Sequence, residues 1–257
     1  MKITVIIPTI GRASLAATRE SLDKQTRRAD EIIVERDFDS SGPAKTRNNG
    51  ARKAHGDVLL FIDDDCVAAP HWIERMATIF ENPTIIAASG AVIYRGDKTN
   101  LFERAVENPD GRWFMGANCA VRRDAFWKLG GFPEKYRVYE DKAFALACLT
   151  RGYAVAQAPT ASVYHEISEW SDRMVKNFAD HLTWWVDLHA DYDLWIDKIN
   201  PPPLWAKHVL MPRDFGAIIK SLVRAPFNKA ARLKFRLLIS QRVQLWKAAV
   251  RAGVFII

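Results

Sequence analysis

The chain has 257 residues, enough for one full domain with an additional segment, and 49% of them are hydrophobic. Its three cysteines are odd in number and far apart, which argues against a disulfide framework or a zinc site and fits a reducing compartment. No apolar stretch is long enough to span a bilayer, and the short apolar start, which ends at Pro8, is expected to be a strand rather than a signal peptide.

The first third of the chain alternates short apolar runs with amphipathic segments. Strands and helices are predicted in turn at residues 3–8, 14–24, 31–35, 44–55, 58–62 and 70–80. Ser14 is a suitable N-cap for the first helix, and Gly56 is suited to stop the second. This order predicts an α/β fold with a parallel, doubly wound sheet flanked by helices.

The pattern is less regular after residue 84. Residues 85–94 are β-rich, residues 140–150 are predicted to be a helix that ends at Gly152, and two strands are predicted at 154–158 and 161–165. A helical region follows Trp170, and a run of three prolines at 201–203 predicts a linker.

Positive charge is concentrated in residues 205–257, which hold 11 Lys and Arg against one acid. A helix over residues 228–251 would carry basic side chains on one side and aromatic and aliphatic side chains on the other. Such a helix suits the surface of an anionic membrane. Packing on the rest of the protein, with the basic side in water, is an equal alternative. No recognised nucleic-acid module accompanies the charge, so we expect no nucleic-acid partner.

Three consecutive aspartates, Asp63, Asp64 and Asp65, directly follow the apolar run at 58–62. In an open α/β sheet, ligands bind at the carboxyl ends of the strands. Three crowded carboxylates repel one another unless a hard divalent cation neutralises them, usually together with substrate phosphates. A solvated turn is the alternative, but the direct attachment to a buried strand favours a ligand site.

Further polar residues are expected at the same edge of the sheet. The first strand leads into a loop that contains Arg12, and the second leads into a segment that contains Asp37 and Asp39. Lys45 and Arg47 stand at the start of a helix, where a phosphate group could bind.

A second cluster lies downstream. The small residues around Gly116 allow a sugar or a similar polar ligand to approach the backbone. Glu140 and Asp141 open a helix, where they act either as cap and dipole partners or as a general base near the metal site. His165 follows a β-rich segment and is either structural or a ligand for a manganese-like ion.

In this order and spacing, five segments resemble the family 2 glycosyltransferases, which have the GT-A fold. The segments are residues 5–9, 42–50, 61–65, 116–133 and 140–153. The resemblance covers residues 3 to 165, about two-thirds of the chain. It implies transfer of a sugar from a nucleotide-diphosphate sugar to an acceptor hydroxyl, with inversion at the anomeric carbon.

The resemblance also implies roles for individual residues. The three aspartates are similar to the family's DXD motif, so that Asp65 would ligate Mn²⁺ or Mg²⁺, Asp63 would lie by the ribose and the metal, and His165 would complete the metal site. Asp141 matches the catalytic base, and Glu140 is its neighbour on the acceptor side. The residues implied in donor binding are Pro8, Thr9, Arg12, Asp37, Asp39, Lys45, Arg47, Asn48, Asp63, Asp64, Gly116, Ala117 and Asn118.

The chain departs from the family pattern after the second strand, where Glu35-Arg-Asp-Phe-Asp39 replaces an Asp-Asp-Gly-Ser type sequence. UDP is the default nucleotide, with GDP and dTDP as alternatives. We expect a glycosyltransferase domain at 1–200, with a donor half at 1–98 and an acceptor half at 99–200, followed by a basic tail at 204–257.

The family often ends in transmembrane helices, which this sequence lacks. We therefore expect a cytoplasmic protein attached peripherally to the inner face of the membrane, where it acts on a glycan or lipid-linked acceptor in cell-envelope assembly. Two alternatives remain: a transferase that uses polyprenyl phosphate directly, and a catalytically silent protein that binds membranes or polyanions.

Overall fold

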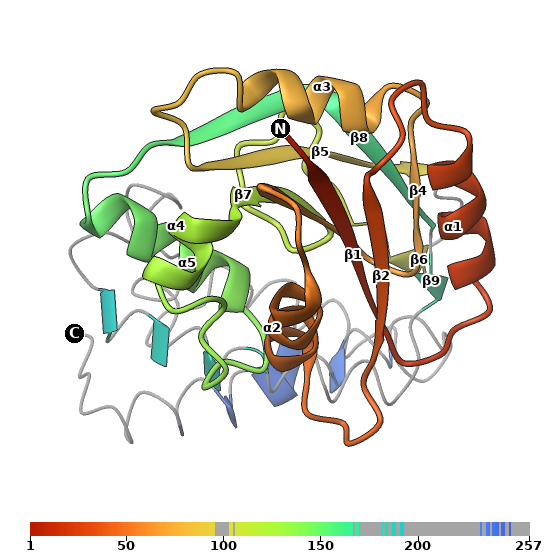
Figure 1. The fold of residues 1–257 in the computed structure, drawn as a ribbon. Coiled ribbons are helices and arrows are strands. Elements are labelled where there is room, and N and C mark those ends of the chain that lie inside the picture. The colour runs from red at the N-terminus through yellow and green to blue at the C-terminus, as the bar shows by residue number, and fades with distance from the viewer. Residues whose placement is uncertain are drawn as a thin grey trace. The chain divides into compact units, whose positions relative to one another are not determined.

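The computed structural model describes residues 1–95, 103–104, 106–166 and 168–169, together with scattered helical residues between 181 and 247 (Figure 1). The chain divides into two compact units, the first formed by residues 1–98 and 105–167 and the second by 99–104 and 168–257. In the second unit, β6 (Glu103–Arg104) pairs with β9 (Ser168–Glu169) in an antiparallel manner. The predicted linker at 201–203 and most of the predicted tail helix lie outside the described residues.

The first unit is an α/β structure. Its strands are β1 (Ile3–Thr9), β2 (Glu31–Arg36), β3 (Val58–Ile62), β4 (Cys66–Ala68), β5 (Ala87–Arg95), β7 (Asn118–Arg122) and β8 (Val155–Glu166). Its helices are α1 (Leu15–Asp23), α2 (Pro43–Lys53), α3 (Trp72–Ile79), α4 (Arg123–Lys128) and α5 (Glu140–Thr150). The elements predicted between residues 3 and 165 are all present, although the two strands predicted at 154–158 and 161–165 are a single strand, β8. The short elements β4, β7 and α4 were not predicted.

The seven strands form one sheet in the order β2-β1-β3-β7-β5-β8-β4. β1 pairs in parallel with both β2 and β3, as the alternation of strands and helices predicts. The rest of the sheet is mixed, because β7 runs antiparallel to β3 and β5, and β4 runs antiparallel to β8. The alternation that sets strand direction through a crossover helix stops after β3, so it could not predict the direction of β7.

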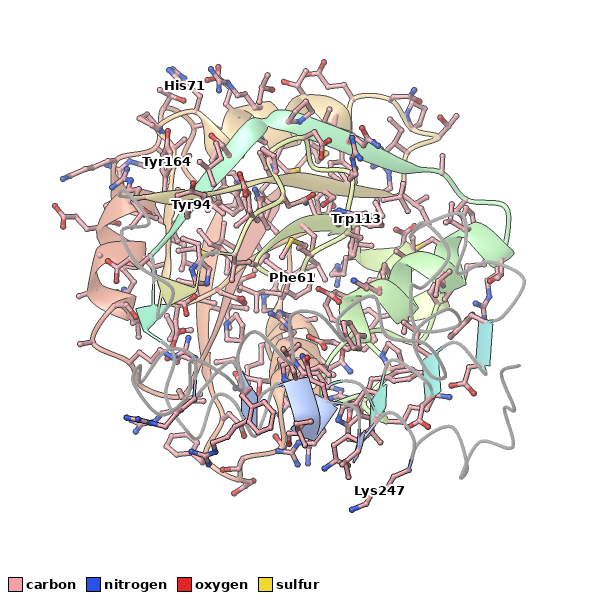
Figure 2. All side chains as sticks on the ribbon, turned by 180° about the vertical axis from the view of Figure 1, so that it is seen from behind. Phe61, His71, Tyr94, Trp113, Tyr164 and Lys247 are labelled. Atoms are coloured by element: carbon pink, nitrogen blue, oxygen red, sulfur yellow. The ribbon has the colours of Figure 1, made fainter. Side chains whose placement is uncertain are left out.

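Helices cover both faces of the sheet (Figure 1). On one face, Leu22 of α1 and Trp72 of α3 pack with alternate residues of β1 such as Val5. On the other face, α2, α4 and α5 lie over a cluster of aromatic rings. Phe61 of β3, labelled in Figure 2, lies there in an edge-to-face contact with Phe132, with 5.2 Å between the ring centroids. Burial of these side chains on both faces fixes the positions of the strand ends.

The strand directions bring chemically active residues to one edge of the sheet. The carboxyl ends of β1, β2, β3 and β8 lie at this edge, as do the amino ends of the antiparallel strands β4 and β7. None of the helices in the described part of the chain is long and apolar enough to cross a membrane.

Candidate active site

A pocket of about 270 Å³ opens at the carboxyl ends of β1, β2 and β3. Its lining residues are Pro8, Thr9, Ile10, Arg12, Asp37, Gly42, Pro43, Thr46, Arg47, Asp63 and Asp64. Seven of these were predicted to bind the donor. Ile10, Gly42, Pro43 and Thr46 also line the pocket and are not among the predicted donor residues, although each lies within or next to a segment expected at this edge.

The remaining predicted donor residues lie outside the pocket lining. Asp39 and Lys45 are exposed. Asn48 is buried in α2, where its amide donates to and accepts from the backbone of Phe132. Asn118 is fully buried in the sheet and uses its amide on the backbone of two other strands and on Trp72. The side chains of Asn48 and Asn118 therefore hold the fold together around the site.

The middle aspartate of the run, Asp64, is almost fully buried. It accepts hydrogen bonds from the hydroxyl of Thr9 and from Arg12, and the Thr9 oxygen in turn accepts the N–H of Gly11. The same nitrogen of Arg12 also contacts Asp65 at 2.6 Å. Asp64 thus anchors the loop after β1, and Arg12 offsets the charges of two aspartates.

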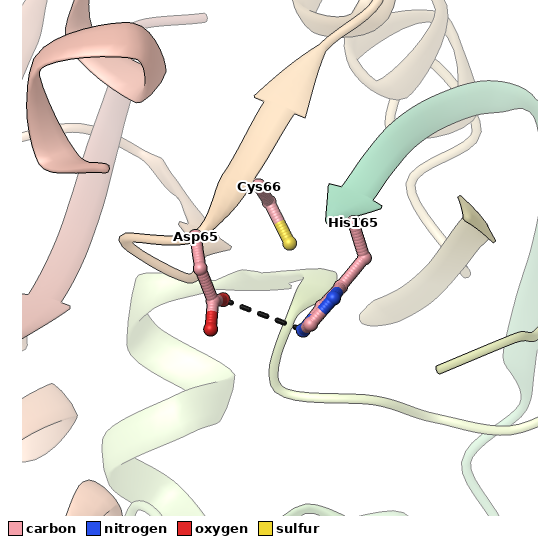
Figure 3. A group of neighbouring side chains, drawn as sticks. All are labelled: Asp65, Cys66 and His165. Carbon is pink, nitrogen blue, oxygen red and sulfur yellow. Dashed lines mark ion pairs between the residues drawn. The ribbon is translucent and has the colours of Figure 1, made fainter. Parts of the chain in front are cut away.

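The third aspartate, Asp65, faces His165 across a distance of 3.4 Å between carboxylate oxygen and Nε2 (Figure 3). Nδ1 of His165 donates a hydrogen bond to the carbonyl oxygen of Glu166 at 2.7 Å, because a carbonyl can only accept. In neutral His165 this leaves a lone pair on Nε2, directed at Asp65. Burial raises the pKa of Asp65, as do Asp63 and Asp64, while His165 and Arg12 oppose the rise.

Cys66 lies beside this pair, because it stands directly opposite His165 in the ladder between β4 and β8. Ligand atoms of Asp65, Cys66 and His165 all lie within 4.8 Å of one another, and Figure 3 shows the thiol directed toward the same space. The wide spacing of the three cysteines gives no reason to expect Cys66 at a site. Its position immediately after Asp65 was the signal that could have placed it at the site.

A charge network joins the first aspartate to α5. Arg47 of α2 donates from one terminal nitrogen to Asp63 and from the other to Glu140, each at 2.6 Å. Burial lowers the pKa of Arg47, but the charges of Asp63 and Glu140 outweigh it, so that the pKa is raised. The guanidinium passes close to Gly116, where a Cβ atom would lie 2.6 Å from the central carbon of Arg47.

Asp141 is held at the first turn of α5. One of its oxygens accepts the N–H of Gly116 at 2.9 Å, and the other accepts the N–H of Lys142 at 2.7 Å. The helix follows Tyr139, whose φ of 69° lies in the left-handed region that residues other than glycine rarely adopt. Burial, and then Asp141, raise the pKa of Glu140 to about 8, with Arg47 opposing the rise.

Asp37 closes the loop that follows β2. Its carboxylate accepts three hydrogen bonds, from the N–H and hydroxyl of Ser41 and from the N–H of Gly42. Partial burial would raise the pKa of Asp37, but the hydrogen bonds together lower it. Asp37 is therefore a stable anion at the pocket wall with part of its acceptor capacity still open.

Comparison with known families agrees with this geometry. Residues 34–146 match the family described as Glycosyl transferase family 2. The uncharacterized glycosyltransferase YwdF of Bacillus subtilis is 26% identical over 206 residues, which cover 67% of this chain and 76% of that protein. The O-antigen chain rhamnosyltransferase RfbN of Salmonella typhimurium is 27% identical over 211 residues, or 64% of this chain and 66% of RfbN.

A third relative is the glucosyl-dolichyl phosphate glucuronosyltransferase of Haloferax volcanii. It is 29% identical over 119 residues, which cover 40% of this chain and 38% of that protein. The chain thus spans from 38% to 76% of the length of these three curated relatives.

Two solved structures have a similar fold. The mannosyltransferase PcManGT of Pyrobaculum calidifontis, in complex with GDP-Man and Mn²⁺, matches with a TM-score of 0.57 at 17% identity over 98% of this chain and 87% of its own. TarS 1–349 of S. aureus, in complex with UDP-GlcNAc, matches with a TM-score of 0.58 at 15% identity over 99% of this chain and 93% of its own.

The matched segment, the relatives and the shared fold agree with one another. Together they support a family 2 glycosyltransferase with the GT-A fold.

Proposed function

We propose that the chain is an inverting, metal-dependent glycosyltransferase that moves a sugar from a nucleotide-diphosphate sugar to an acceptor hydroxyl. The observation that carries this proposal is the arrangement at the edge of the sheet. A pocket lined by Arg12, Arg47 and Asp63 lies at the run of aspartates, and Asp141 is held at the start of α5. Inversion by direct displacement needs one base for the acceptor proton and one cation for the leaving diphosphate.

The residues present fit a divalent cation. Asp65 offers a carboxylate oxygen and His165 a ring nitrogen whose tautomer is set by its bond to Glu166. We assign these two residues as protein ligands for Mn²⁺ or Mg²⁺, with Asp63 as a further carboxylate nearby. When bound, the cation would neutralise charge on the leaving diphosphate. Arg12, which already contacts Asp64 and Asp65, would add positive charge at the same place.

Asp141 is the proposed general base. Its two hydrogen bonds to backbone N–H groups fix the carboxylate and leave further lone pairs free to accept the proton of an acceptor hydroxyl. In this assignment Asp37 lies by the nucleobase, while the small side chains at Gly116 and Ala117 leave room for the sugar.

Known relatives support the substrate class. One structural neighbour was solved with GDP-Man and Mn²⁺ and another with UDP-GlcNAc. Relatives named for O-antigen chain and glucosyl-dolichyl phosphate substrates support a glycan or lipid-linked acceptor in cell-envelope assembly. We take a UDP-sugar as the default donor, and we propose that the basic residues 204–257 hold the protein on the cytoplasmic face of the membrane.

The test is sugar transfer or donor hydrolysis with UDP-, GDP- and dTDP-sugars, offered with glycan and polyprenyl-phosphate acceptors and Mn²⁺. Asp141→Asn should lower kcat by about 100-fold or more, because it removes the base but keeps the shape. Asp124→Asn, on the exposed start of α4, is the matched control and should retain full activity. Full activity of Asp141→Asn would contradict the assignment of the base.

A further inference from the structure

Glu140 is placed where it cannot meet an acceptor directly. Its side chain is 6% exposed, and one carboxylate oxygen is bonded to Arg47. The left-handed conformation of Tyr139 begins the helix, with Glu140 buried and Asp141 bonded to the loop at Gly116. A residue that contacts an acceptor should reach the surface of the site, whereas a buried residue that is hydrogen-bonded to another side chain acts on that partner.

The partner, Arg47, is equally enclosed. Its side chain is 5% exposed, and among the described residues its Nε atom has no hydrogen-bond partner. The two terminal nitrogens therefore carry the polar interactions of the guanidinium, one to Asp63 and one to Glu140. A planar guanidinium can join two carboxylates in this way, because its two terminal nitrogens point in fixed, different directions. The ammonium group of lysine has a single nitrogen and cannot hold two carboxylates in this geometry.

The two carboxylates belong to opposite ends of the proposed reaction. Asp63 follows β3 and lines the donor pocket, whereas Glu140 begins the helix that carries Asp141. Arg47 lies between them and against Gly116, whose N–H holds Asp141. A displacement of any of these groups would be transmitted through the guanidinium to the others.

We propose that Arg47 and Glu140 are positioning residues that form a rigid bridge between the donor-side carboxylate Asp63 and the helix that carries Asp141. The inference rests on the proposed function, and it replaces an acceptor-side role for Glu140 with a role inside the protein. Its specific consequence is that a change at Glu140 alters donor binding before any acceptor is present. An acceptor-contacting residue would affect only steps that involve the acceptor.

A double-mutant cycle tests the bridge. UDP and GDP, each with Mn²⁺ and without acceptor, are titrated into the wild type, Asp63→Asn, Glu140→Gln and the double variant. The bridge predicts that the effects of the two substitutions on Kd depart from additivity by at least about threefold. In an Arg47→Lys background the departure should fall below about twofold.

The control cycle pairs Glu140→Gln with Asp37→Asn, because Asp37 lines the same pocket but bonds to Ser41 and Gly42 instead of Arg47. This pair should be additive. Additivity of Asp63→Asn with Glu140→Gln, or equal coupling in the Arg47→Lys background, would overturn the proposal.

The same cycle measured by urea unfolding needs no ligand. Coupling between Asp63 and Glu140 in unfolding stability, lost in Arg47→Lys, is expected from the buried pair. If the wild type bound neither nucleotide, the proposed function would fail while unfolding still decided whether the bridge exists. Additive unfolding effects would then reject the bridge independently.

Discussion

Three identical residues in a row acquire three different environments at the end of β3. Asp63 is bonded to Arg47, Asp64 is buried against Thr9 and Arg12, and Asp65 faces His165. The N–H of Cys66 bonds back to the carbonyl of Asp63, so the run forms a tight turn that sends each side chain in a different direction. One carboxylate thus serves the fold while its two neighbours remain at the proposed metal and donor sites.

Glu140 gives a prediction on pH. Its pKa in the folded protein, about 8, lies above the ordinary value of 4.5. Between these two pH values the folded protein therefore keeps the proton on Glu140, whereas the unfolded chain has lost it. The stability that Glu140 contributes is fully present below pH 4.5 and is lost as the pH rises through 8. Relative to Glu140→Gln, the wild type should therefore lose on the order of a few kcal/mol of unfolding free energy between about pH 5 and 9.

The measurement is urea unfolding of both proteins across that pH range. Glu81→Gln, an exposed substitution of the same type, should follow the wild type at every pH. A constant difference between wild type and Glu140→Gln from pH 5 to 9 would show that Glu140 has an ordinary pKa.

At the scale of elements, the loop that precedes β7 helps to position the candidate site through Gly116. Gly116 lets the guanidinium of Arg47 pass and donates its N–H to Asp141, so this loop connects α2 with the start of α5. A residue with a side chain at this position would occupy the space of the guanidinium, because its Cβ would lie within 3 Å of three Arg47 atoms.

Gly116→Ala should therefore displace Arg47, cost about 1–3 kcal/mol of unfolding free energy and reduce transfer activity by about tenfold or more. Gly130→Ala is the control, since no atom of the described residues lies within 4 Å of its added Cβ and its φ of 91° is what opposes the change. That variant should lose stability by about 1 kcal/mol and keep its activity. Equal activity in the two alanine variants would show that the space beside Arg47 is not required.

Some of these elements can be predicted from the sequence and others cannot, for physical reasons. β3 reads as a buried strand because all five of its residues are apolar and both faces of the sheet are covered. β7 contains Asn118 and ends in a charged residue, so only its pairing with β3 and β5 reveals a strand. The structural roles of Asn48 and Asn118 could not be predicted either. The sequence does not distinguish an asparagine that bonds to a distant backbone group from one that bonds to a ligand.

At the scale of the whole molecule, the two parts of the chain differ in net charge. Residues 205–257 hold 11 Lys and Arg against one acid, whereas the rest of the chain has more acids than Lys and Arg. Within this segment, Arg232, Arg236 and Lys247 are helical and exposed. If this segment holds the protein on the membrane, as we propose, its basic side chains would bind anionic lipid headgroups with a strength that falls as salt screens the charges.

The full chain should therefore sediment with vesicles that contain anionic lipid and should dissociate as salt is raised. Replacing Arg232, Arg236 and Lys247 together with Glu should weaken this binding by about tenfold or more, since each basic residue near the surface contributes about 1 kcal/mol. Neutral vesicles and a variant with Lys2→Glu serve as controls. Binding that is equal on neutral and anionic vesicles would contradict an electrostatic role for the tail.

The central claim is that the pocket binds a nucleotide diphosphate through a divalent cation held by Asp65 and His165. Calorimetry of UDP, GDP and dTDP with Mn²⁺, and then with chelator, tests it most directly, with Asp65→Asn as the site variant. The account predicts that one nucleotide binds only with the cation and that Asp65→Asn weakens this binding by about tenfold or more. Binding that is unchanged by chelator and by Asp65→Asn, or no binding of any nucleotide to well-folded protein, would contradict it.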